Sequence, residues 1–402
     1  MTITATDLNL RHLRAFSEVC QRGSISQAAQ VVHLSQPAIT HAIAGLEDQL
    51  RTKLFQRMPR GMAPTDLGAR FHLRVRRALL RLNDTMSRGT RTPKRNPLRV
   101  EARATSAQLR ALLAIGETAS YSAAARLMGT AQPTVYRAAR DLEHGLGVTL
   151  FEKSANGVRL TREGELLQQD ARLMFSELDQ ALQEINTDLG RGPAQIRVGA
   201  LPLARATILS DAINQTFEGA MPLQVYVDDG PFPDLLQAVR RGSLDILLGA
   251  LRDPPPFKDI VQETLFLDQL AVFCGPDHPL LGQTDIHVAD LAGYPWILPR
   301  SNTPTRNSFE HAFPHLSKDI SGSLVETSSM VLVRALLQSH QRLTLISKAQ
   351  VETETRQGLV IELPITLNTP PRAIGILHRA DWYPTAEQEG FLSALRRAGS
   401  RM

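Results

Sequence analysis

Residues 23–40 read GSISQAAQVVHLSQPAIT, and their pattern of Ser, Ala-Ala and Gln-Pro returns at residues 119–136 as ASYSAAARLMGTAQPTVY. Around this stretch, residues 13–68 align without a gap on residues 109–164, and 18 of the 56 positions are identical. Unrelated segments of this length would agree at roughly four positions, so the chain contains a duplicated unit. We call the two halves of the duplication copy one and copy two; equivalent residues are 96 positions apart.

Each copy is predicted to form three short helices followed by a turn-rich hairpin. The apolar stripe of the first helix in copy one consists of Leu13, Phe16 and Val19. Ser24 is the expected cap of a second helix that begins at Ser26, and Ser35 is the expected cap of a third that begins at Gln36-Pro37. Proline is tolerated there because the first N–H groups of a helix have no intrahelical partner.

The third helix of copy one has an apolar side and a polar side. Ile39, Ile43 and Leu46 are spaced by four and three residues and therefore share one side. The residues expected to face outward are Gln36, Pro37, Thr40 and His41, with Gln132, Pro133, Tyr136 and Arg137 at the equivalent positions of copy two. Two helices joined by a short turn, with polar side chains outward on the second, predict a DNA-binding helix-turn-helix. A small three-helix bundle without a nucleic-acid role is the alternative.

The hairpin after the third helix is interpreted as a wing, with its turn at Arg60-Gly61-Met62 in copy one and at Asn156-Gly157-Val158 in copy two. Copy one has no Lys or Arg from Gly23 to Leu46, so its phosphate contacts are expected from basic residues on either side. These candidates are Arg11, Arg14, Arg51, Lys53, Arg57 and Arg60. In copy two the candidates are Lys153 in the hairpin and Arg137, which suits guanine or phosphate.

Basic residues are concentrated in the first quarter of the chain. Residues 1–96 hold 16 Lys and Arg against 6 Asp and Glu, residues 97–192 hold 11 against 12, and residues 193–402 hold 18 against 22. A basic head on a slightly acidic body is typical of a polyanion-binding protein. A solvated basic face with no such partner would have the same charge balance.

These motifs closely resemble the winged helix-turn-helix of LysR-type transcriptional regulators. In copy one the resemblance lies in residues 23–29, 34–40, 46–47, 54–57 and 65–68. In copy two it lies in residues 120–125, 131–135, 142–143, 146–147, 150–153 and 160–164. That family ordinarily has one such domain per chain, and this chain has two, so the family's rules of operator geometry do not transfer directly.

Both copies also depart from the family pattern. In copy two, Ala131 stands where a capping Ser is usual, so the third helix either loses its side-chain cap or uses Thr130. In copy one, Arg51 stands where Gly is usual, and Pro64 must lie on an edge because it cannot donate to a strand pair. Copy two is interpreted as a re-specialised DNA reader. A structural or protein-interaction module is the alternative.

A long helix is predicted after each wing. The stripe in copy one consists of Phe71, Val75, Ala78, Leu79, Leu82 and Met86. The stripe in copy two consists of Leu167, Ala171, Met174, Leu178, Ala181 and Ile185, a spacing typical of a short coiled-coil seam. The resemblance implies a dimerising linker helix, and a core helix packed within one chain is the alternative. Residues 88–97, RGTRTPKRNP, are interpreted as an inter-domain linker.

From Gln195 onward, short apolar strands alternate with helices. Strands are expected at residues 196–201, 223–227, 245–248, 270–274, 296–298, 343–346 and 373–377, and a helix at 235–241. This alternation predicts α/β layers with mostly parallel strands and two small lobes. Residues 241–246, 277–280 and 295–299 resemble the effector-binding domain of the same regulators, which implies a periplasmic-binding-protein-like two-lobed fold.

A small-molecule effector is expected between the two lobes, at the carboxyl ends of strands and near helix N-termini. The candidate residues in three such loops are Leu201, Pro202, Leu203, Ser301, Thr303, Thr327 and Ser328. Each hydroxyl residue among them would serve equally well as a helix cap. Arg205 is a candidate partner for a ligand carboxylate, although an exposed Arg without such a role is the commoner case.

Composition and motifs exclude several protein classes. With 43% hydrophobic and 21% charged residues the chain is an ordinary globular protein, and no stretch is apolar enough to span a bilayer. Cys20 and Cys274 alone exclude a disulfide framework and a four-cysteine zinc site, and both are expected to be inert buried thiols. The N-terminus has no secretory pattern, so the cytoplasm is expected.

Enzyme motifs are not found either. His311 and His315 have a metal-ligand spacing, but Pro314 would break the helix that aligns them. The sequence contains no H-E-x-x-H, G-x-S-x-G, Walker or G-x-G-x-x-G motif. No catalytic residue, metal or cofactor is therefore expected.

The sequence as a whole predicts two α-rich winged helix-turn-helix domains with linker helices, followed by an α/β two-lobed effector domain. The expected divisions are copy one at 1–66, a linker helix and inter-domain linker at 67–98, copy two at 99–163, a dimerising linker helix at 164–192 and the effector domain at 193–402. Lobe I is expected at about 193–270 and 372–402, and lobe II at about 271–371.

The predicted function is a sequence-specific transcriptional regulator that binds double-stranded DNA and responds to a small-molecule effector. It is expected to form a homodimer or homotetramer and not to bind a membrane, and RNA polymerase is a further candidate partner. A regulator in which only copy one touches DNA is the alternative, and an enzyme built on a binding-protein fold is a more distant one.

Overall fold

The computed structural model describes residues 3–58, 61–89, 100–155, 157–219, 222–316, 324–339 and 341–402. The chain divides into two compact units, Met1–Ala194 and Gln195–Met402, and each is described by itself. The predicted wing residues Arg60 and Asn156 lie outside the described residues, as do residues 90–97 of the predicted linker.

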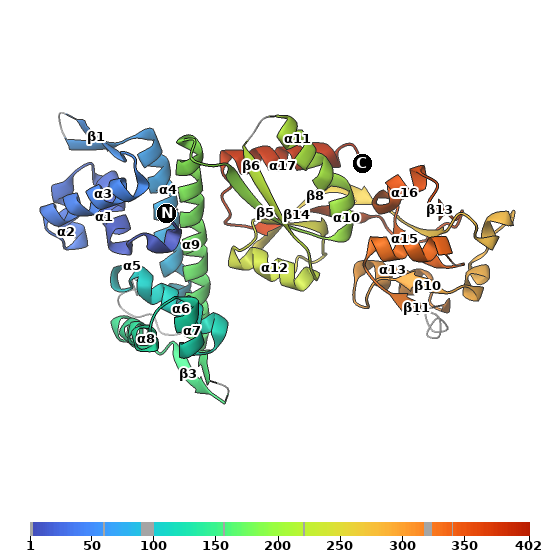
Figure 1. The fold of residues 1–402 in the computed structure, drawn as a ribbon, viewed down its shortest axis with the longest axis horizontal. Helices are drawn as coiled ribbons and strands as arrows, with labels where there is room; N and C mark the ends of the chain where they lie inside the picture. Colours follow the sequence, from blue (N-terminus) through green and yellow to red (C-terminus); the bar gives the residue numbers. More distant parts are fainter. Residues whose placement is uncertain are drawn as a thin grey trace. The chain divides into compact units, whose positions relative to one another are not determined.

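The first unit contains both copies of the repeat (Figure 1). The elements of copy one are η1 (Ala5–Asp7), α1 (Leu10–Arg22), α2 (Ile25–Val32), α3 (Gln36–Leu50), β1 (Phe55–Met58), β2 (Gly61–Pro64) and α4 (Asp66–Gly89). Those of copy two are α5 (Val100–Arg103), α6 (Ser106–Thr118), α7 (Tyr121–Leu127), α8 (Gln132–Leu146), β3 (Phe151–Ser154), β4 (Gly157–Leu160) and α9 (Arg162–Asp188). The predicted order of three helices, a hairpin and a long helix is thus present in each copy.

Side-chain caps set the helix starts in copy one. The hydroxyl of Ser24 accepts from the N–H of Gln27, and that of Ser35 accepts from the N–H of Ala38, so both predicted caps are confirmed. Helix α2 begins at Ile25, one residue before the predicted start. In copy two, Ala131 is the N-cap residue of α8 and supplies no side-chain hydrogen bond, so the alternative of a cap at Thr130 is wrong.

The shared Leu-Glu and Leu-Phe motifs attach each hairpin to the helix before it. In copy one a carboxylate oxygen of Glu47 accepts from the N–H groups of Leu54 and Phe55, at 3.0 and 3.3 Å. In copy two Glu143 accepts from the equivalent Leu150 and Phe151 at 2.8 and 3.1 Å. These bonds satisfy N–H groups at the start of each hairpin in the same way in both copies.

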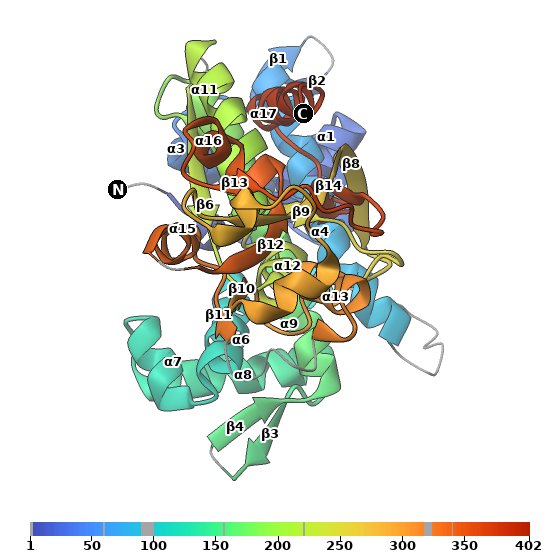
Figure 2. The same ribbon diagram turned by 90° about the vertical axis from the view of Figure 1, so that its right-hand side faces the viewer.

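Helices α4 and α9 pack along each other within the chain. Phe71, Val75, Ala78 and Leu82 on α4, and their equivalents Leu167, Ala171, Met174 and Leu178 on α9, are all at most 1% exposed. One hydrophobic core contains buried residues of both copies and of both long helices. The structure therefore contains the intrachain packing that was the alternative to a dimerising helix. Figures 1 and 2 show the wings at opposite ends of this helix pair.

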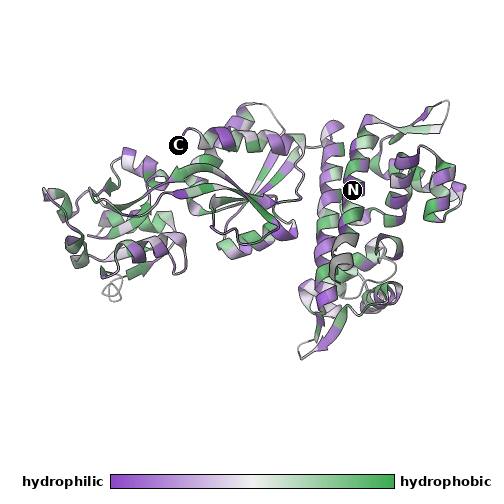
Figure 3. Cartoon of the chain, turned by 180° about the vertical axis from the view of Figure 1, so that it is seen from behind, coloured by the Kyte–Doolittle hydropathy of each residue, from purple (hydrophilic) through white to green (hydrophobic). Residues whose placement is uncertain are grey.

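The second unit is built on two five-stranded sheets with helices against their faces. Lobe I contains β5 (Ala194–Ala200), β6 (Leu223–Asp228), β7 (Ile246–Ala250), β8 (Ile260–Asp268) and β14 (Arg372–Arg379), with α10 (Pro202–Ala204), η2 (Arg205–Leu209), α11 (Ser210–Glu218), α12 (Phe232–Arg241) and α17 (Ala386–Gly399). Lobe II contains β9 (Leu270–Cys274), β10 (Trp296–Leu298), β11 (Leu324–Glu326), β12 (Leu343–Ser347) and β13 (Ile361–Glu362). Its helices are η3 (Pro279–Gly282), η4 (Val288–Gly293), α13 (Pro304–Ala312), α15 (Met330–Ser339), η6 (Ala349–Val351) and α16 (Glu352–Arg356). The hydrophobic colouring of Figure 3 follows the central strands.

The prediction of mostly parallel strands is wrong, because both sheets are mixed. In lobe I the strand order is β6-β5-β7-β14-β8, and β14 is antiparallel to both β7 and β8. In lobe II the order is β11-β10-β12-β9-β13, and β9 is antiparallel to β12 and β13. The chain passes from lobe I to lobe II between β8 and β9, and it returns to lobe I between β13 and β14. Strands β9 and β14 therefore join their sheets without a helix that crosses over the sheet. Parallel pairing needs such a crossover, and antiparallel pairing does not.

Candidate nucleic-acid interface and effector-binding site

The outward face of α3 carries the predicted base-reading residues of copy one. Gln36, Pro37, Thr40 and His41 are all exposed, while Ile39 on the opposite side is fully buried. The hydroxyl of Thr40 donates to the backbone oxygen of Gln36 at 3.1 Å, one turn earlier in the same helix. Because the Thr40 hydroxyl is bonded within its own helix, Gln36 and His41 are the long polar side chains that this face presents to solvent.

The equivalent face of α8 is also exposed, and its side chains make more contacts with one another and with the backbone than those of α3. The hydroxyl of Ser122 and the side-chain oxygen of Gln132 are 2.9 Å apart, and the guanidinium of Arg137 donates to the backbone oxygen of Pro133 at 3.4 Å. Tyr136 is 44% exposed and packs edge-on against Tyr121, with ring centroids 5.3 Å apart. Copy two thus presents a fixed aromatic ring where copy one presents a threonine.

Arg140 does not add a free cation to that face. Its guanidinium donates to the Tyr136 hydroxyl at 3.2 Å and to Glu143 at 2.6 Å. Hydrogen bonds to Tyr136 and then to Glu143 raise the pKa of Arg140. Since Glu143 also holds the wing, Arg140 links the outward face of α8 to the hairpin.

The predicted phosphate contacts lie around the exposed hairpins. Arg57 on β1 and Lys153 on β3 are exposed at the third position of each first wing strand, and their positions are equivalent. Lys53 is exposed and pairs with Glu47 at 2.7 Å. Arg51 ends α3 in the left-handed region with φ of 52°, where copy two has Gly147 with φ of 68°. The structure therefore leaves Arg57 and Lys153 available at the wings.

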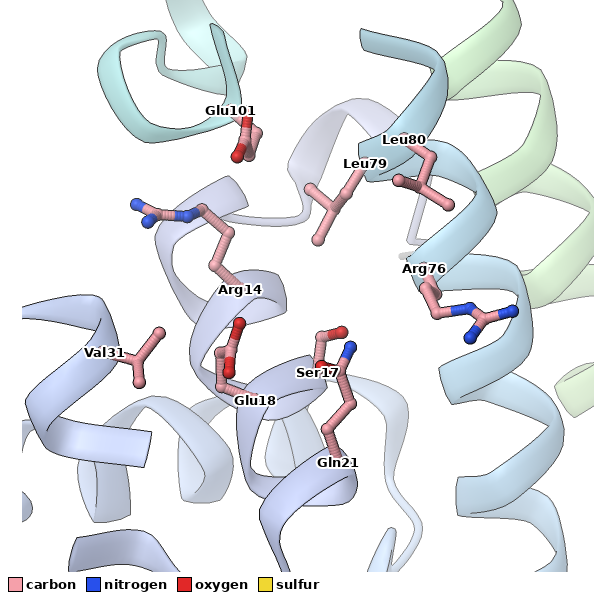
Figure 4. A pocket seen from close by; sticks show the side chains of 9 residues that line it. All are labelled: Arg14, Ser17, Glu18, Gln21, Val31, Arg76, Leu79, Leu80 and Glu101. Carbon is pink, nitrogen blue, oxygen red and sulfur yellow. The ribbon is translucent and has the colours of Figure 1, made fainter. Parts of the chain in front are cut away.

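A shallow hollow of about 130 Å³ lies between α1 and α4 (Figure 4). Its lining residues are Arg14, Ser17, Glu18, Gln21, Val31, Arg76, Leu79, Leu80 and Glu101. In copy two, Leu113 and Phe175 occupy the positions of Ser17 and Leu79, and Phe175 is buried. At these two positions copy one has the smaller side chain. Its mixed charge and open rim do not resemble an apolar ligand site.

In the second unit, the predicted effector loops follow strands of both sheets. Leu201 follows β5 in lobe I, and its N–H donates to Leu248 of β7. In lobe II the loops after β10 and β11 start side by side, because these strands are parallel and the N–H of Thr327 donates to Leu298. Helix α10 of lobe I contacts η6 of lobe II, so the carboxyl ends of β5 and β12 face each other. The predicted loops therefore belong to one region.

Several of the predicted polar residues are helix or turn caps. Thr303 is the N-cap of α13: its hydroxyl accepts from the N–H of Arg306 and donates to the backbone oxygen of Arg300. The hydroxyl of Thr327 accepts from the N–H of Ser329. Ser301 and Ser328 are exposed, and Leu203 is buried. Arg205 pairs with Asp229 at 2.8 Å, so its side chain already has an acidic partner.

The cationic part of this region was missed by the sequence analysis. Arg372 at the start of β14 donates to Asp268 in lobe I and to Thr305 in lobe II, at 2.5 and 2.6 Å. Asp268 also accepts from Ser347 of lobe II at 2.5 Å. Burial and the charge of Arg372 lower the pKa of Arg252, which follows β7. In the sequence, Asp268 is visible only as an acidic residue within an apolar run. The link from Asp268 through Arg372 to lobe II therefore could not be predicted.

Other titratable groups do not form a catalytic or metal centre among the described residues. Cys274 is buried as expected, whereas Cys20 is only partly buried, so that part of the prediction is wrong; burial raises the pKa of each thiol to about 12. Helix α13 ends at Ala312, so His311 and His315 do not share one helix. Within the described part of the chain, no group of three or more His, Cys, Asp or Glu is placed to hold a metal ion. No described helix meets the length and hydropathy needed to cross a membrane.

Two protein families match this chain. The family described as bacterial regulatory helix-turn-helix protein, lysR family, matches twice, at residues 10–69 and 106–165. The LysR substrate binding domain matches residues 190–400. The two matches of the first family coincide with the two copies of the repeat.

Individual relatives extend over most of the chain. The HTH-type transcriptional regulator GalR of Pseudomonas putida is 30% identical over 389 residues, which are 96% of each chain. The regulator PcaQ of Agrobacterium fabrum is 25% identical and covers 75% of this chain but 97% of its own length. Among solved structures, ArgP from Mycobacterium tuberculosis has a TM-score of 0.55 at 17% identity, covering 73% of this chain and 96% of its own. The last similarity concerns the fold alone.

Proposed function

The chain belongs to the LysR family of transcriptional regulators, and on that premise we propose that both copies of its repeat read double-stranded DNA. The chain is a transcriptional regulator with an effector-binding domain, and its relatives are regulators and not enzymes. Regulators of this family bind DNA and small-molecule effectors and form oligomers. The proposal concerns the tandem arrangement and the residues that carry each contact.

The observation that carries the proposal is the equivalence of two exposed faces. Helices α3 and α8 each begin with Gln-Pro, expose the first turn and bury the opposite side. Glutamine at such a position suits adenine, whose major-groove edge offers one acceptor and one donor. Each face is followed by a hairpin with an exposed cation, Arg57 or Lys153, suited to phosphate.

Copy two is the part of the proposal with a competing function. A purely structural module would not need an exposed Arg137 beside an ordered tyrosine ring, which favours base or phosphate contacts. The competing function is a protein-interaction module. Tyrosine and arginine are also enriched in protein interfaces, so residue type does not distinguish the two functions. They are distinguished by whether copy two contributes to DNA binding.

The experiment is a salt titration of the full-length chain on a duplex selected from random sequence. We expect the logarithm of affinity to fall linearly with the logarithm of salt concentration, with a slope of about −0.9 per neutralised phosphate. Arg57→Ala and Lys153→Ala should each reduce that slope by about one unit. The matched control is Arg197→Ala, an exposed residue of the second unit.

Two outcomes would change the proposal. Binding that is absent or insensitive to salt would remove DNA reading by this chain. If Lys153→Ala and Arg137→Ala leave affinity, footprint and sequence preference unchanged while Arg57→Ala does not, copy two is a protein-interaction or structural module.

For the effector we propose the region where α10 faces η6, with the loops of Leu201, Pro202 and Leu203, of Ser301 and Thr303, and of Thr327 and Ser328 forming its walls. Arg252 and Arg372 stand at the lobe I side of this region against the single buried acid Asp268. The guanidinium Nε of Arg372 is buried without a hydrogen-bond partner among the described residues. This balance favours an anionic effector, because an anion would neutralise the excess charge and accept the remaining donor.

The test is a thermal-shift measurement with small carboxylates, namely acetate, succinate, citrate and benzoate, and with inorganic phosphate. We expect at least one anion to raise the unfolding temperature, and Arg252→Ala to remove that shift. Arg241→Ala, an exposed arginine at the end of α12, is the control. A neutral molecule that binds equally well to the Arg252→Ala chain would show that the effector is not an anion.

A further inference from the structure

We infer that a single chain supplies a complete pair of DNA-reading heads. Equivalent positions of α4 and α9 have opposite charges, so α4 pairs with α9 of the same chain and not with an α4 of another chain. The inference rests on the proposed function of the heads, but its first test does not depend on DNA.

The apolar part of the contact is shared symmetrically by the two copies. Phe71 and Leu167, Val75 and Ala171, and Leu82 and Leu178 are equivalent pairs, and all six side chains are at most 1% exposed. An interface that uses the same patch on both partners is the pattern of a two-fold dimer. Here the two partners are halves of one chain.

The charged part of the contact is not shared symmetrically. Arg74 on α4 is 1% exposed and donates to Glu177 at 3.0 Å and to Glu184 at 2.6 Å, both on α9. Glu177 is 4% exposed and also accepts from Arg77 at 2.8 Å. Burial works to lower the pKa of Arg74, but hydrogen bonds and charge from Glu184 and Glu177 outweigh it and the pKa is raised.

The pairs also give the direction of the helices. Arg70 near the start of α4 contacts Asp188 at the end of α9, whereas Arg81, further along α4, contacts Glu177 earlier in α9. Residues later in α4 contact residues earlier in α9, so the two helices are antiparallel. A two-fold axis across the pair then exchanges copy one with copy two.

Equivalent positions have opposite charges, and this decides which helices can pair. Position 170 corresponds to position 74, and position 177 to position 81, so copy two has Asp170 and Glu177 where copy one has Arg74 and Arg81. The same contact between two α4 helices would put Arg74 against Arg81. Between two α9 helices it would put Asp170 against Glu177. Burying like charges without a partner is strongly unfavourable, so only the mixed pair is favourable.

Further hydrogen bonds join the two copies besides those between the long helices. The N–H of Ala5 in η1 donates to Asp179 of α9, and the hydroxyl of Ser106 in α6 donates to the backbone oxygen of Leu8 at 2.5 Å. Arg191, after α9, donates to the backbone oxygens of Leu50 at 2.7 Å and Arg51 at 2.8 Å. Copy one therefore bonds to segments of copy two at its N-terminal end and at the end of α3 as well as along α4.

If α4 and α9 pair within the chain, the second DNA-reading head of a pair comes from the same chain and not from a partner chain. The resemblance implies a dimerising linker helix, and a dimer joined through that helix would present four heads. If α4 and α9 are already paired within the chain, oligomers must form through other surfaces, and each chain contributes a ready pair of heads to the duplex. Two linked heads bind a pair of sub-sites with avidity that exceeds either alone by ~10² or more.

The first test cross-links the helix pair in the full-length chain. Arg70 and Asp188 lie at the partly exposed rim of the contact, so Arg70→Cys with Asp188→Cys provides two accessible thiols for a short bismaleimide. We expect the cross-linked product to keep the 44.3 kDa mass of one chain, plus the reagent, on a denaturing gel and by mass spectrometry. The variants that carry only one of the two introduced cysteines, with the native Cys20 and Cys274 in place, are the controls and should form no cross-link.

Two results of this test would overturn the inference. Covalent dimers would mean that α4 pairs with the α9 of another chain. Failure of the double variant to cross-link, while both thiols react with a monofunctional maleimide, would mean that the two helices do not pair.

The second test mixes chains that each have one disabled head. Gln36→Glu with Thr40→Glu disables copy one, and Gln132→Glu with Arg137→Glu disables copy two, all at exposed positions. Co-expressed under different tags and purified together, the two variants should remain about 10²-fold weaker than the parent on the selected duplex, because no chain then has two working heads. Recovery towards the parent affinity would show that pairs form between chains. If neither variant alone loses affinity, the proposed DNA-reading function fails, and the cross-linking result still decides the pairing.

Discussion

Arg74 and Glu177 are both buried, with Nη1 and Oε1 3.0 Å apart, although they stand 103 residues apart in the chain. Each belongs to a different copy of the repeat. Glu177 also contacts Arg77 and Arg81, so three guanidinium groups share this one buried carboxylate, and Arg74 pairs with Glu184 as well.

Glu177→Gln should lower the free energy of unfolding of the first unit by about 3 to 5 kcal/mol, because the buried Arg74 would lose one of its two carboxylate partners and Arg77 and Arg81 would lose a contact to the same anion. The measurement is a urea titration of the full-length chain followed by a probe of helix content. Glu165→Gln, exposed in the first turn of α9, is the matched control and should change stability by less than about 1 kcal/mol. Equal effects of the two substitutions would contradict the role assigned to Glu177.

Arg51→Gly should raise stability by about 1 kcal/mol, because Arg51 holds a left-handed conformation with φ of 52° that costs a side chain roughly that amount. Its backbone oxygen, which accepts from Arg191, is retained in the variant. Gly147→Ala at the equivalent turn of copy two should have the opposite sign. Thermal unfolding of the two variants checks both, and a loss of stability in Arg51→Gly would show that its side chain has a role of its own.

Gln36→Ala and Gln132→Ala should each relax base preference at separate positions of the binding site, by about 1 to 3 kcal/mol. The two copies differ beside these residues, with Thr40 and His41 in one and Tyr136 and Arg137 in the other. Their sub-sites should therefore differ in sequence. Selection of binding sites from random DNA for each variant measures this, and loss of preference at the same position in both would contradict two distinct readers.

Thr303→Val should lower the stability of the second unit by about 1 kcal/mol, because the N-cap bond to Arg306 is lost. Thr303→Ser retains the hydroxyl and is the control. Ser301→Ala, at an exposed position, should leave stability within about 0.5 kcal/mol and weaken the response to an anionic effector. DNA affinity of all three should stay within a few fold. A full effector response in Ser301→Ala would exclude Ser301 from the site.

Cys20 and Cys274 should react very slowly with iodoacetamide at pH 8 in the folded chain. Burial disfavours the charged thiolate and raises the pKa of each to about 12, so only about one thiol in 10⁴ is ionised at that pH. In urea both should react quickly, with an ordinary cysteine pKa near 8.5. Rapid labelling of either residue without denaturant would show that it is accessible and ionised.

The local architecture of both heads could be predicted from the sequence. Serine caps, the Gln-Pro start of α3 and the spacing of Ile39, Ile43 and Leu46 are properties of one helix and its neighbours in sequence, so they can be recognised without tertiary contacts. The offset of 96 residues then transferred the same interpretation to copy two. The apolar stripes of both long helices were identified for the same reason.

The partner against which each stripe packs could not be predicted from the sequence and is seen in the folded chain. An amphipathic stripe states that one face is buried but not which partner buries it, and the acid and base that select the partner, Glu177 and Arg74, are 103 residues apart. The mixed sheets and the link from Arg372 to Asp268 and Thr305 depend in the same way on segments that meet only after folding. Pairing between distant segments is set by shape and charge across a contact, and neither leaves a periodic signal within one segment of sequence.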